Sequence, residues 1–235
     1  MADVLVLGKR FNGPPASGNG GYSCGAIAGF LDGPAEVTLR APPPLDRPLS
    51  VLRTSDGVEV HDADRLIGTA RPATVDLPIP EPVSFAAAEA ASEAFPWRTS
   101  HPLPGCFVCG SARAPGDGLR LFPGAVPGRS LAAVPWQPDA TIASPDGLVT
   151  PECVWASLDC PSYFGIYARD GSTPNALLGR LAARIERRPR VGERCVILGW
   201  CTASDGRKHE VGSALFSADQ GLCAAAKGTW VTLRS

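Results

Sequence analysis

The chain has 235 residues, of which 22 are lysine or arginine and 23 are aspartate or glutamate, so its net charge is −1. This balance argues against a general nucleic-acid-binding protein, which usually carries a strong basic excess. Hydrophobic residues make up 44% of the chain, and no apolar run approaches the roughly 18 residues that a membrane span needs. The first residues lack the pattern of a signal peptide. We therefore expect a globular, cytoplasmic protein with neither nucleic acid nor a membrane as partner.

The first predicted helix covers residues 20–31, where small and apolar side chains occupy nearly the whole helical surface. Such a helix is expected to be buried under a sheet. Residues 58–61 alternate apolar and polar side chains, as half-buried strands do. Strands are predicted at 36–40, 49–53, 58–61 and 66–70, and a short connecting helix at 86–94.

Residues 96–125 are rich in proline, glycine and cysteine, which predicts a linker. Within it, Cys106 and Cys109 form a C-x-x-C arrangement, and His101 lies just upstream. These three side chains could supply zinc ligands, but the sequence has no second C-x-x-C or well-spaced Cys/His pair to complete a site. We expect a structural turn and no metal, with reduced cysteines throughout.

The second buried helix is predicted over residues 151–160. Thr150 is a suitable N-cap and Pro151 suits the first helical position. Pro161 is expected to end or kink this helix, because proline lacks the N–H of a helix interior. Strands are predicted after it at 176–186, 194–201, 210–217 and 222–233.

The order of these elements repeats along the chain. Each half contains one apolar helix followed by four strands, and a turn signal separates two of the strands in each half, at Asp56-Gly57 and at Asp205-Gly206. Repetition of a whole unit is a stronger indication than any single motif. The predicted organisation is an N-terminal unit at 1–95, the linker at 96–125 and a C-terminal unit at 126–235.

A buried helix followed by an antiparallel meander resembles the hotdog fold, in which a curled sheet wraps a central helix. Two such units in one chain resemble the double-hotdog acyl-CoA thioesterases of the thioesterase II family, over residues 3–95 and 126–235. The resemblance implies an α+β double hotdog, with two helix-wrapped antiparallel sheets in tandem.

The helix starts carry a second resemblance. Asn19-Gly20-Gly21 is similar to the His-Gly-Gly turn of single-hotdog thioesterases of the phenylacetyl-CoA type, with asparagine in place of histidine. Those proteins carry an acidic residue seven positions after the second glycine. In this chain the position falls on Ala28 in the first half and on Asp159 in the second. The resemblance implies one composite site, with the turn supplied by one half and the carboxylate by the other.

The segment that ends at Asp159 also resembles the helix that bears the catalytic aspartate in the thioesterase II family. That family adds a threonine or serine and a glutamine, which help the aspartate to orient an attacking water. The corresponding positions fall near Ala183 and Thr229, and neither matches cleanly.

Each candidate has a chemical and a structural interpretation. Asp159 is the candidate base or nucleophile for thioester hydrolysis, or an ordinary aspartate near a helix end. Gly20 and Gly21 could present bare N–H groups to an oxyanion, or could serve only close packing. Asn19 could orient water or act as an N-cap, and Tyr22 could line an acyl pocket or belong to the core.

Three functions remain open from the sequence. The first is an acyl-CoA thioesterase-like hydrolase of a small or fatty acyl thioester, with no cofactor. The second is a non-catalytic acyl or acyl-CoA binding protein, because the threonine and glutamine equivalents are missing. The third is a hotdog dehydratase or hydratase, for which His101 in the linker is a poorly placed candidate. In each case the partner is an acyl-CoA-type small molecule, and a homo-oligomer is possible.

Overall fold

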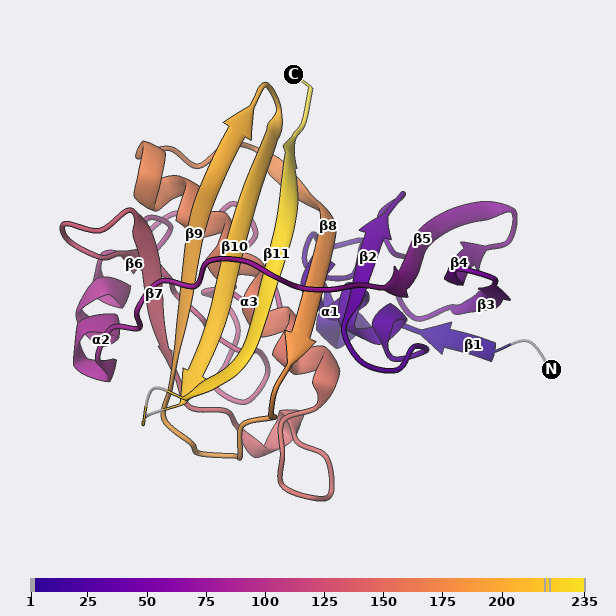
Figure 1. The fold of residues 1–235 in the computed structure, drawn as a ribbon, viewed down its shortest axis with the longest axis horizontal. Coiled ribbons are helices and arrows are strands. Elements are labelled where there is room, and N and C mark those ends of the chain that lie inside the picture. The colour runs from indigo at the N-terminus through magenta and orange to yellow at the C-terminus, as the bar shows by residue number, and fades with distance from the viewer. Residues whose placement is uncertain (1–2, 218, 220, 235) are drawn as a thin grey trace.

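The computed structural model describes residues 3–217, 219 and 221–234. Its strands form one eleven-stranded sheet in the order β1-β3-β4-β5-β2-β8-β11-β10-β9-β7-β6, and every paired neighbour is antiparallel (Figure 1). The strands are β1 (Asp3–Val6), β2 (Ala35–Leu39), β3 (Pro48–Thr54), β4 (Gly57–Asp62), β5 (Arg65–Pro72), β6 (Gly124–Ala125), β7 (Leu131–Trp136), β8 (Ala176–Ile185), β9 (Cys195–Asp205), β10 (Lys208–Ser217) and β11 (Leu222–Thr232). The helices are α1 (Gly20–Ala28), α2 (Phe85–Glu93) and α3 (Pro151–Asp170), with short 3-10 turns at Lys9–Phe11 and Ala140–Ile142.

The two halves share this sheet, whereas two separate sheets were expected. Strand β2 of the first half pairs with β8 of the second, in a register that runs from Ala35 opposite Ala183 to Thr38 opposite Arg180. Both strands would otherwise be edge strands with unpaired N–H and C=O groups, and pairing satisfies those groups. Each half has one helix followed by four strands, as predicted, but only the last three strands of each half form a meander. The first strand, β2 or β8, pairs instead with the last one, β5 or β11. Main-chain hydrogen bonds between β2 and β8 join the two halves.

Helix α1 packs most closely against α3, which is longer than expected. The close approach depends on small residues, because a Cβ atom on Gly25 would lie only 2.8 Å from both Glu152 Cα and Trp155 Cβ. Figure 1 shows α1 beside β2 and β8, at the junction of the two halves. The start of α1 therefore lies against the middle of α3, and the start of α3 lies against the middle of α1.

Pro161 does not end α3, so the first of the two sequence-based alternatives, an end or a kink at this residue, is wrong. The helix continues for nine residues beyond the proline to Asp170 and ends at Gly171, which adopts a left-handed conformation with φ of 70°. The residues that follow Pro161 remain buried as far as Ile166, so packing against the sheet offsets the missing hydrogen bond. Sheet side chains also satisfy helix carbonyls nearby, as Ser213 Oγ donates to the Leu158 carbonyl at 2.7 Å.

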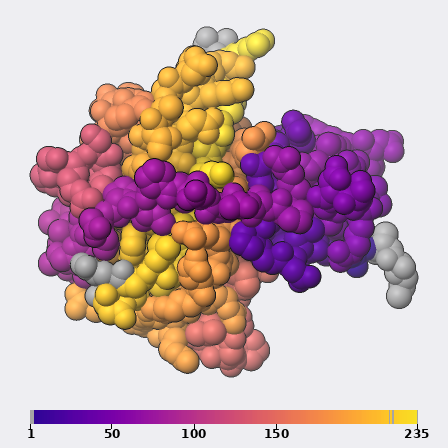
Figure 2. Space-filling view, viewed as in Figure 1, coloured from indigo at the N-terminus to yellow at the C-terminus, as the bar shows by residue number. Residues whose placement is uncertain are grey.

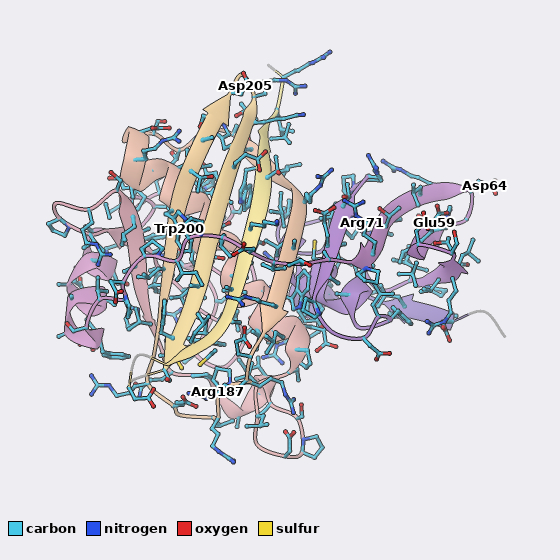
Figure 3. All side chains as sticks on the ribbon, in the orientation of Figure 1. Glu59, Asp64, Arg71, Arg187, Trp200 and Asp205 are labelled. Atoms are coloured by element: carbon cyan, nitrogen blue, oxygen red, sulfur yellow. The ribbon has the colours of Figure 1, made fainter. Side chains whose placement is uncertain are left out.

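The chain between β5 and α2 crosses the face of the sheet opposite α3 (Figures 1 and 2). Leu77, Ile79 and Val83 of this segment pack in a second apolar cluster with Trp200 and Phe216 of the sheet. Figure 3 labels Trp200 on β9, beneath the crossing segment. The C-terminal part of the sheet is thus covered on both faces. Among the described helices, none combines the length and apolar character needed to cross a membrane.

Candidate functional site

Asp159 lies inside α3, and only 2% of its surface is exposed. Its Oδ2 atom accepts hydrogen bonds from Asn19 Nδ2 at 2.8 Å and from the Gly21 N–H at 2.9 Å. Its Oδ1 atom is buried and has no partner among the described residues. A buried acceptor without a partner is costly in a folded protein, so such an atom points to a function or to an absent partner.

Burial raises the pKa of Asp159 to about 7. Desolvation is the largest cause, and the nearby Cys106 thiol acts in the same direction. The hydrogen bonds from the Gly21 N–H and from Asn19 oppose this effect, because they favour the charged carboxylate. The carboxyl group is consequently a stronger base than an aspartate in water.

Asn19 performs two tasks at the start of α1. Its Oδ1 atom accepts the Tyr22 N–H at 2.9 Å, which caps the helix, while its Nδ2 atom donates to Asp159. The N-cap interpretation and the site interpretation therefore hold together. A single amide side chain links the first turn of α1 to the carboxylate in the middle of α3.

Both glycines at this turn are closely packed, and Gly21 is sterically required because it faces main-chain atoms of α3. A Cβ atom on Gly21 would lie 2.5 Å from Asp159 Cβ and 2.9 Å from the Trp155 carbonyl oxygen. One on Gly20 would lie 2.9 Å from Leu178 Cδ2. Both residues thus allow α1 to pack closely, Gly20 against Leu178 of β8 and Gly21 against α3. The Gly21 N–H is already donated to Asp159, whereas Gly20 is the first residue of α1 and has no acceptor one turn earlier in the helix.

Tyr22 belongs to an aromatic cluster next to this turn. Its ring stacks on Phe11 with centroids 3.8 Å apart, and it meets Phe107 edge-on at 5.8 Å. Phe107 comes from the predicted linker, so this segment packs into the core instead of running over the surface. Tyr22 is half-buried beside the site, and burial raises the pKa of its hydroxyl.

Thr229 lies apart from these residues. Its hydroxyl donates to Glu210 Oε2 at 2.9 Å on the outer face of the sheet, whereas the next residue, Trp230, donates to Ser162 of α3. Ala183, the other position considered, is a buried residue of β8 opposite Ala35. The structure thus brings together Asp159, Asn19, Gly20 and Gly21, with Tyr22 adjacent, and leaves Thr229 outside.

Three cysteines surround the same region. Cys106 and Cys109 of the C-x-x-C lie beside Cys160, the residue that follows Asp159, and all three are buried. Asn19 Nδ2 lies 4.0 Å from Cys106 Sγ. Hydrogen bonds from the other two thiols lower the pKa of Cys106, and the backbone N–H groups of Val108 and Cys109 add to the effect. Sequence reasoning missed Cys160, because 50 residues of intervening chain give no spacing signal.

Two surface hollows lie elsewhere. One, of about 280 Å³, is lined by residues of β2, β4 and β5 that include Glu59 and Arg71, both labelled in Figure 3. The other, of about 120 Å³, lies between the crossing segment and the sheet, near Phe85 and Phe216. Asp159 lines neither hollow. In this conformation its Oδ1 atom is enclosed by the protein.

Comparisons of the structure with solved structures identify the fold, whereas comparisons of the sequence find no match. No protein-family model and no curated protein matches the sequence. A protein of unknown function with a hotdog fold from Alicyclobacillus acidocaldarius superimposes with a TM-score of 0.64 at 10% identity, over 100% of this chain and 96% of that one. The chain has the hotdog fold. A tesB protein from Mycobacterium avium subspecies paratuberculosis gives 0.62 at 14% identity, over 98% of this chain and 92% of that one. A Thermobifida fusca protein provisionally named a thioesterase II gives 0.59 at 13% identity, over 98% and 92%.

Proposed function

We propose that this hotdog protein is an acyl-CoA thioesterase-like hydrolase of a small or fatty acyl thioester, with Asp159 as general base or nucleophile. The observation that carries the proposal is the unequal use of the two carboxylate oxygens. Oδ2 is held by Asn19 and Gly21, while the buried Oδ1 has no partner among the described residues. A carboxylate fixed through one oxygen leaves the other available to a reacting group.

As a base, Asp159 Oδ1 would take a proton from a water molecule while the water oxygen attacks the thioester carbonyl carbon. The carbon–sulfur bond then breaks, and the proton held on Asp159 Oδ1 passes to the departing thiolate, which gives the free acid, the thiol and the regenerated carboxylate. As a nucleophile, Oδ1 would attack the carbonyl carbon itself and expel the thiolate, leaving a mixed anhydride that water hydrolyses. Both routes use the same atom and need no cofactor.

The first turn of α1 offers the donor that the oxyanion requires. Gly20 has no acceptor within its helix, and its position at the N-terminus places it at the positive end of the helix dipole. A Cβ built on Gly20 would lie 3.5 Å from Asp159 Oδ2, so this turn and the carboxylate border the same space. The tesB and thioesterase II names of two fold neighbours support the same substrate class.

A non-catalytic acyl or acyl-CoA binding protein is the second candidate. Two observations favour it. Asp159 is 2% exposed, and the Gly21 N–H that could bind an oxyanion is already donated to Asp159. In that case the Asn19–Asp159 pair would hold the two helices together, and the protein would bind an acyl ligand without turnover.

The deciding experiment measures thiol release from a panel of acyl-CoAs of increasing chain length. We expect Asp159→Asn to lower the rate by about 100-fold or more, in line with the usual contribution of a general base. Asp170→Asn is the matched control, because it removes an exposed aspartate from the end of the same helix. Equal rates for the wild-type protein and Asp159→Asn would refute the catalytic role. Ligand-induced thermal stabilisation without turnover would favour the binding protein.

A further inference from the structure

Three sulfur atoms converge in the core next to α3. The Sγ atoms of Cys106, Cys109 and Cys160 all lie within 4.8 Å of one another, and all three residues are buried. Zinc bound by thiolates has Zn–S distances of about 2.3 Å, which in a tetrahedral site separates the sulfurs by about 3.8 Å. The three side chains are therefore close to the spacing of zinc ligands before any ion is considered.

The C-x-x-C turn is shaped by its backbone. The Gly110 N–H donates to the Cys106 carbonyl at 2.9 Å, and the Cys106 N–H donates to the Leu103 carbonyl at 2.9 Å. A Cβ atom on Gly110 would lie 2.4 Å from the Cys106 carbonyl oxygen and 2.5 Å from that of Pro104, so only glycine fits. Tight backbone turns of this kind fix two cysteine side chains toward one point, as short C-x-x-C ligand pairs do.

A polar group lies next to one of the three sulfurs. Asn19 Nδ2 is 4.0 Å from Cys106 Sγ. Donors to a ligand atom are the usual outer partners of a metal site.

We propose that Cys106, Cys109 and Cys160 bind one zinc ion, which ties the turn at residues 103–110 to α3. Soft thiolate ligands in a closed, buried site favour zinc over magnesium or calcium. The proposal is independent of the proposed hydrolase function. It replaces the sequence-based expectation of no metal, because the fold supplies a third cysteine that the sequence does not place next to the first two.

His101 is not a ligand in this arrangement. Its Nδ1 atom accepts the Leu103 N–H at 2.9 Å, so in the neutral ring Nε2 carries the hydrogen and cannot ligate. That Nε2 atom is buried with no hydrogen-bond partner among the described residues.

The test measures metal in the full-length protein expressed with zinc in the medium and purified without chelator. We expect one zinc ion per chain by mass spectrometry of the metal, and the release of that zinc when a mercurial blocks the thiols. Cys106→Ser and Cys160→Ser should each lose most of the zinc. Cys223→Ser is the matched control, since Cys223 is a buried cysteine of β11 outside the cluster, and it should keep the full zinc content.

A second measurement uses only the wild-type protein, so it tests the proposal even if the cysteine variants do not fold. Wild-type protein refolded with Co²⁺ in place of zinc should show the intense sulfur-to-cobalt charge-transfer absorption of a thiolate site. Absence of both zinc and this absorption in the folded wild-type protein would overturn the proposal. So would a Cys106–Cys109 disulfide in protein taken from a reducing cytosol, because it would consume two of the three ligands.

The outcome is separable from that of the proposed function. Asp159→Asn is expected to retain zinc, because the carboxylate oxygens of Asp159 are not part of the three-sulfur group. Zinc retained with activity lost would support both proposals. Zinc lost in this variant would make Asp159 a metal ligand and would contradict its role as base.

Discussion

Asn19 Nδ2 lies 2.8 Å from Asp159 Oδ2, although the two residues are 140 positions apart in the chain. The bond is buried, and it joins the start of α1 to the interior of α3. The first half of the chain therefore holds the carboxylate that the second half carries. By the resemblance noted from the sequence, the position that corresponds to Asp159 in the first half is occupied by Ala28, which has no carboxylate.

Replacement of Asn19 should separate helix capping from carboxylate positioning. Asn19→Ala removes both the cap and the donor to Asp159, so we expect a loss of about 2 kcal/mol in unfolding free energy. Asn19→Ser keeps a good N-cap, but its side chain is too short to reach Asp159. The serine variant should therefore regain about 1 kcal/mol in denaturant unfolding while thiol release stays low. Full activity in Asn19→Ser would show that this hydrogen bond does not position the carboxylate.

Isotope labelling distinguishes the two roles considered for Asp159. In a single turnover in heavy-oxygen water, attack of water on the Asp159 carbonyl carbon of the mixed anhydride would place the label in the carboxylate, so a labelled Asp159 identifies the nucleophilic route. A general base should leave the protein unlabelled and place the heavy oxygen in the acid product. Mass spectrometry of the peptide that contains Asp159 makes this comparison.

Gly21→Ala should be strongly destabilising. The added Cβ atom would lie 2.5 Å from Asp159 Cβ, so α1 and α3 would have to move apart. We expect a loss of about 1–3 kcal/mol, despite the better helix propensity of alanine. Gly29→Ala at the end of the same helix is the control. The nearest atom to its Cβ would be the Ala26 carbonyl oxygen at 3.4 Å, so this substitution should be neutral or slightly stabilising. Similar melting temperatures for the two variants would argue against close helix packing.

The Arg187–Glu193 pair should make stability depend on pH. Figure 3 shows Arg187 at the opposite end of the sheet from Asp205. Hydrogen bonds from Arg187, at 2.5 and 3.2 Å, hold the pKa of Glu193 below its usual value of 4.5, and the Arg190 N–H adds to the effect. A lowered pKa stabilises the folded protein above pH 4.5, and this contribution disappears as the pH falls through the lowered pKa.

We therefore expect Glu193→Gln to cost about 0.5 kcal/mol in urea unfolding near neutral pH, the usual size for a partly exposed pair. The difference from the wild-type protein should vanish in acid, where the protonated Glu193 of the wild-type protein is as neutral as the glutamine of the variant. Arg187→Gln should cost a similar amount, and the double variant should cost little more than either. A difference that is the same at both pH values would mean that the charge of Glu193 is not involved.

Local sequence signals were sufficient for most elements. The hairpin signals at Asp56-Gly57 and Asp205-Gly206 correspond to the turns between β3 and β4 and between β9 and β10, where Gly57 and Gly206 have positive φ. Thr150 and Pro151 correctly mark the start of α3. These signals reside in the residues themselves. The pairing of β2 with β8 has no such signal, because main-chain groups make those hydrogen bonds whatever the side chains are.

The candidate site was predictable only in its parts. The Gly-Gly turn and the position of Asp159 were visible from the helix pattern, and a resemblance suggested that the two halves contribute different groups. The involvement of Phe107 and Cys160 was not visible, since both depend on how residues 96–125 fold back onto α1 and α3. Pro161 was misjudged because burial along α3 outweighs a local rule about proline.

For the proposed hydrolase, the hydrogen bonds between β2 and β8 restrict the movements that could open a path to Asp159. Two domains joined by a flexible linker can rotate apart, but two halves that share one continuous sheet cannot separate without breaking these bonds. Access for an acyl chain would then depend on local rearrangement of a buried segment such as the turn at residues 103–110. A zinc ion bound as proposed would tie that turn to α3 and oppose this rearrangement.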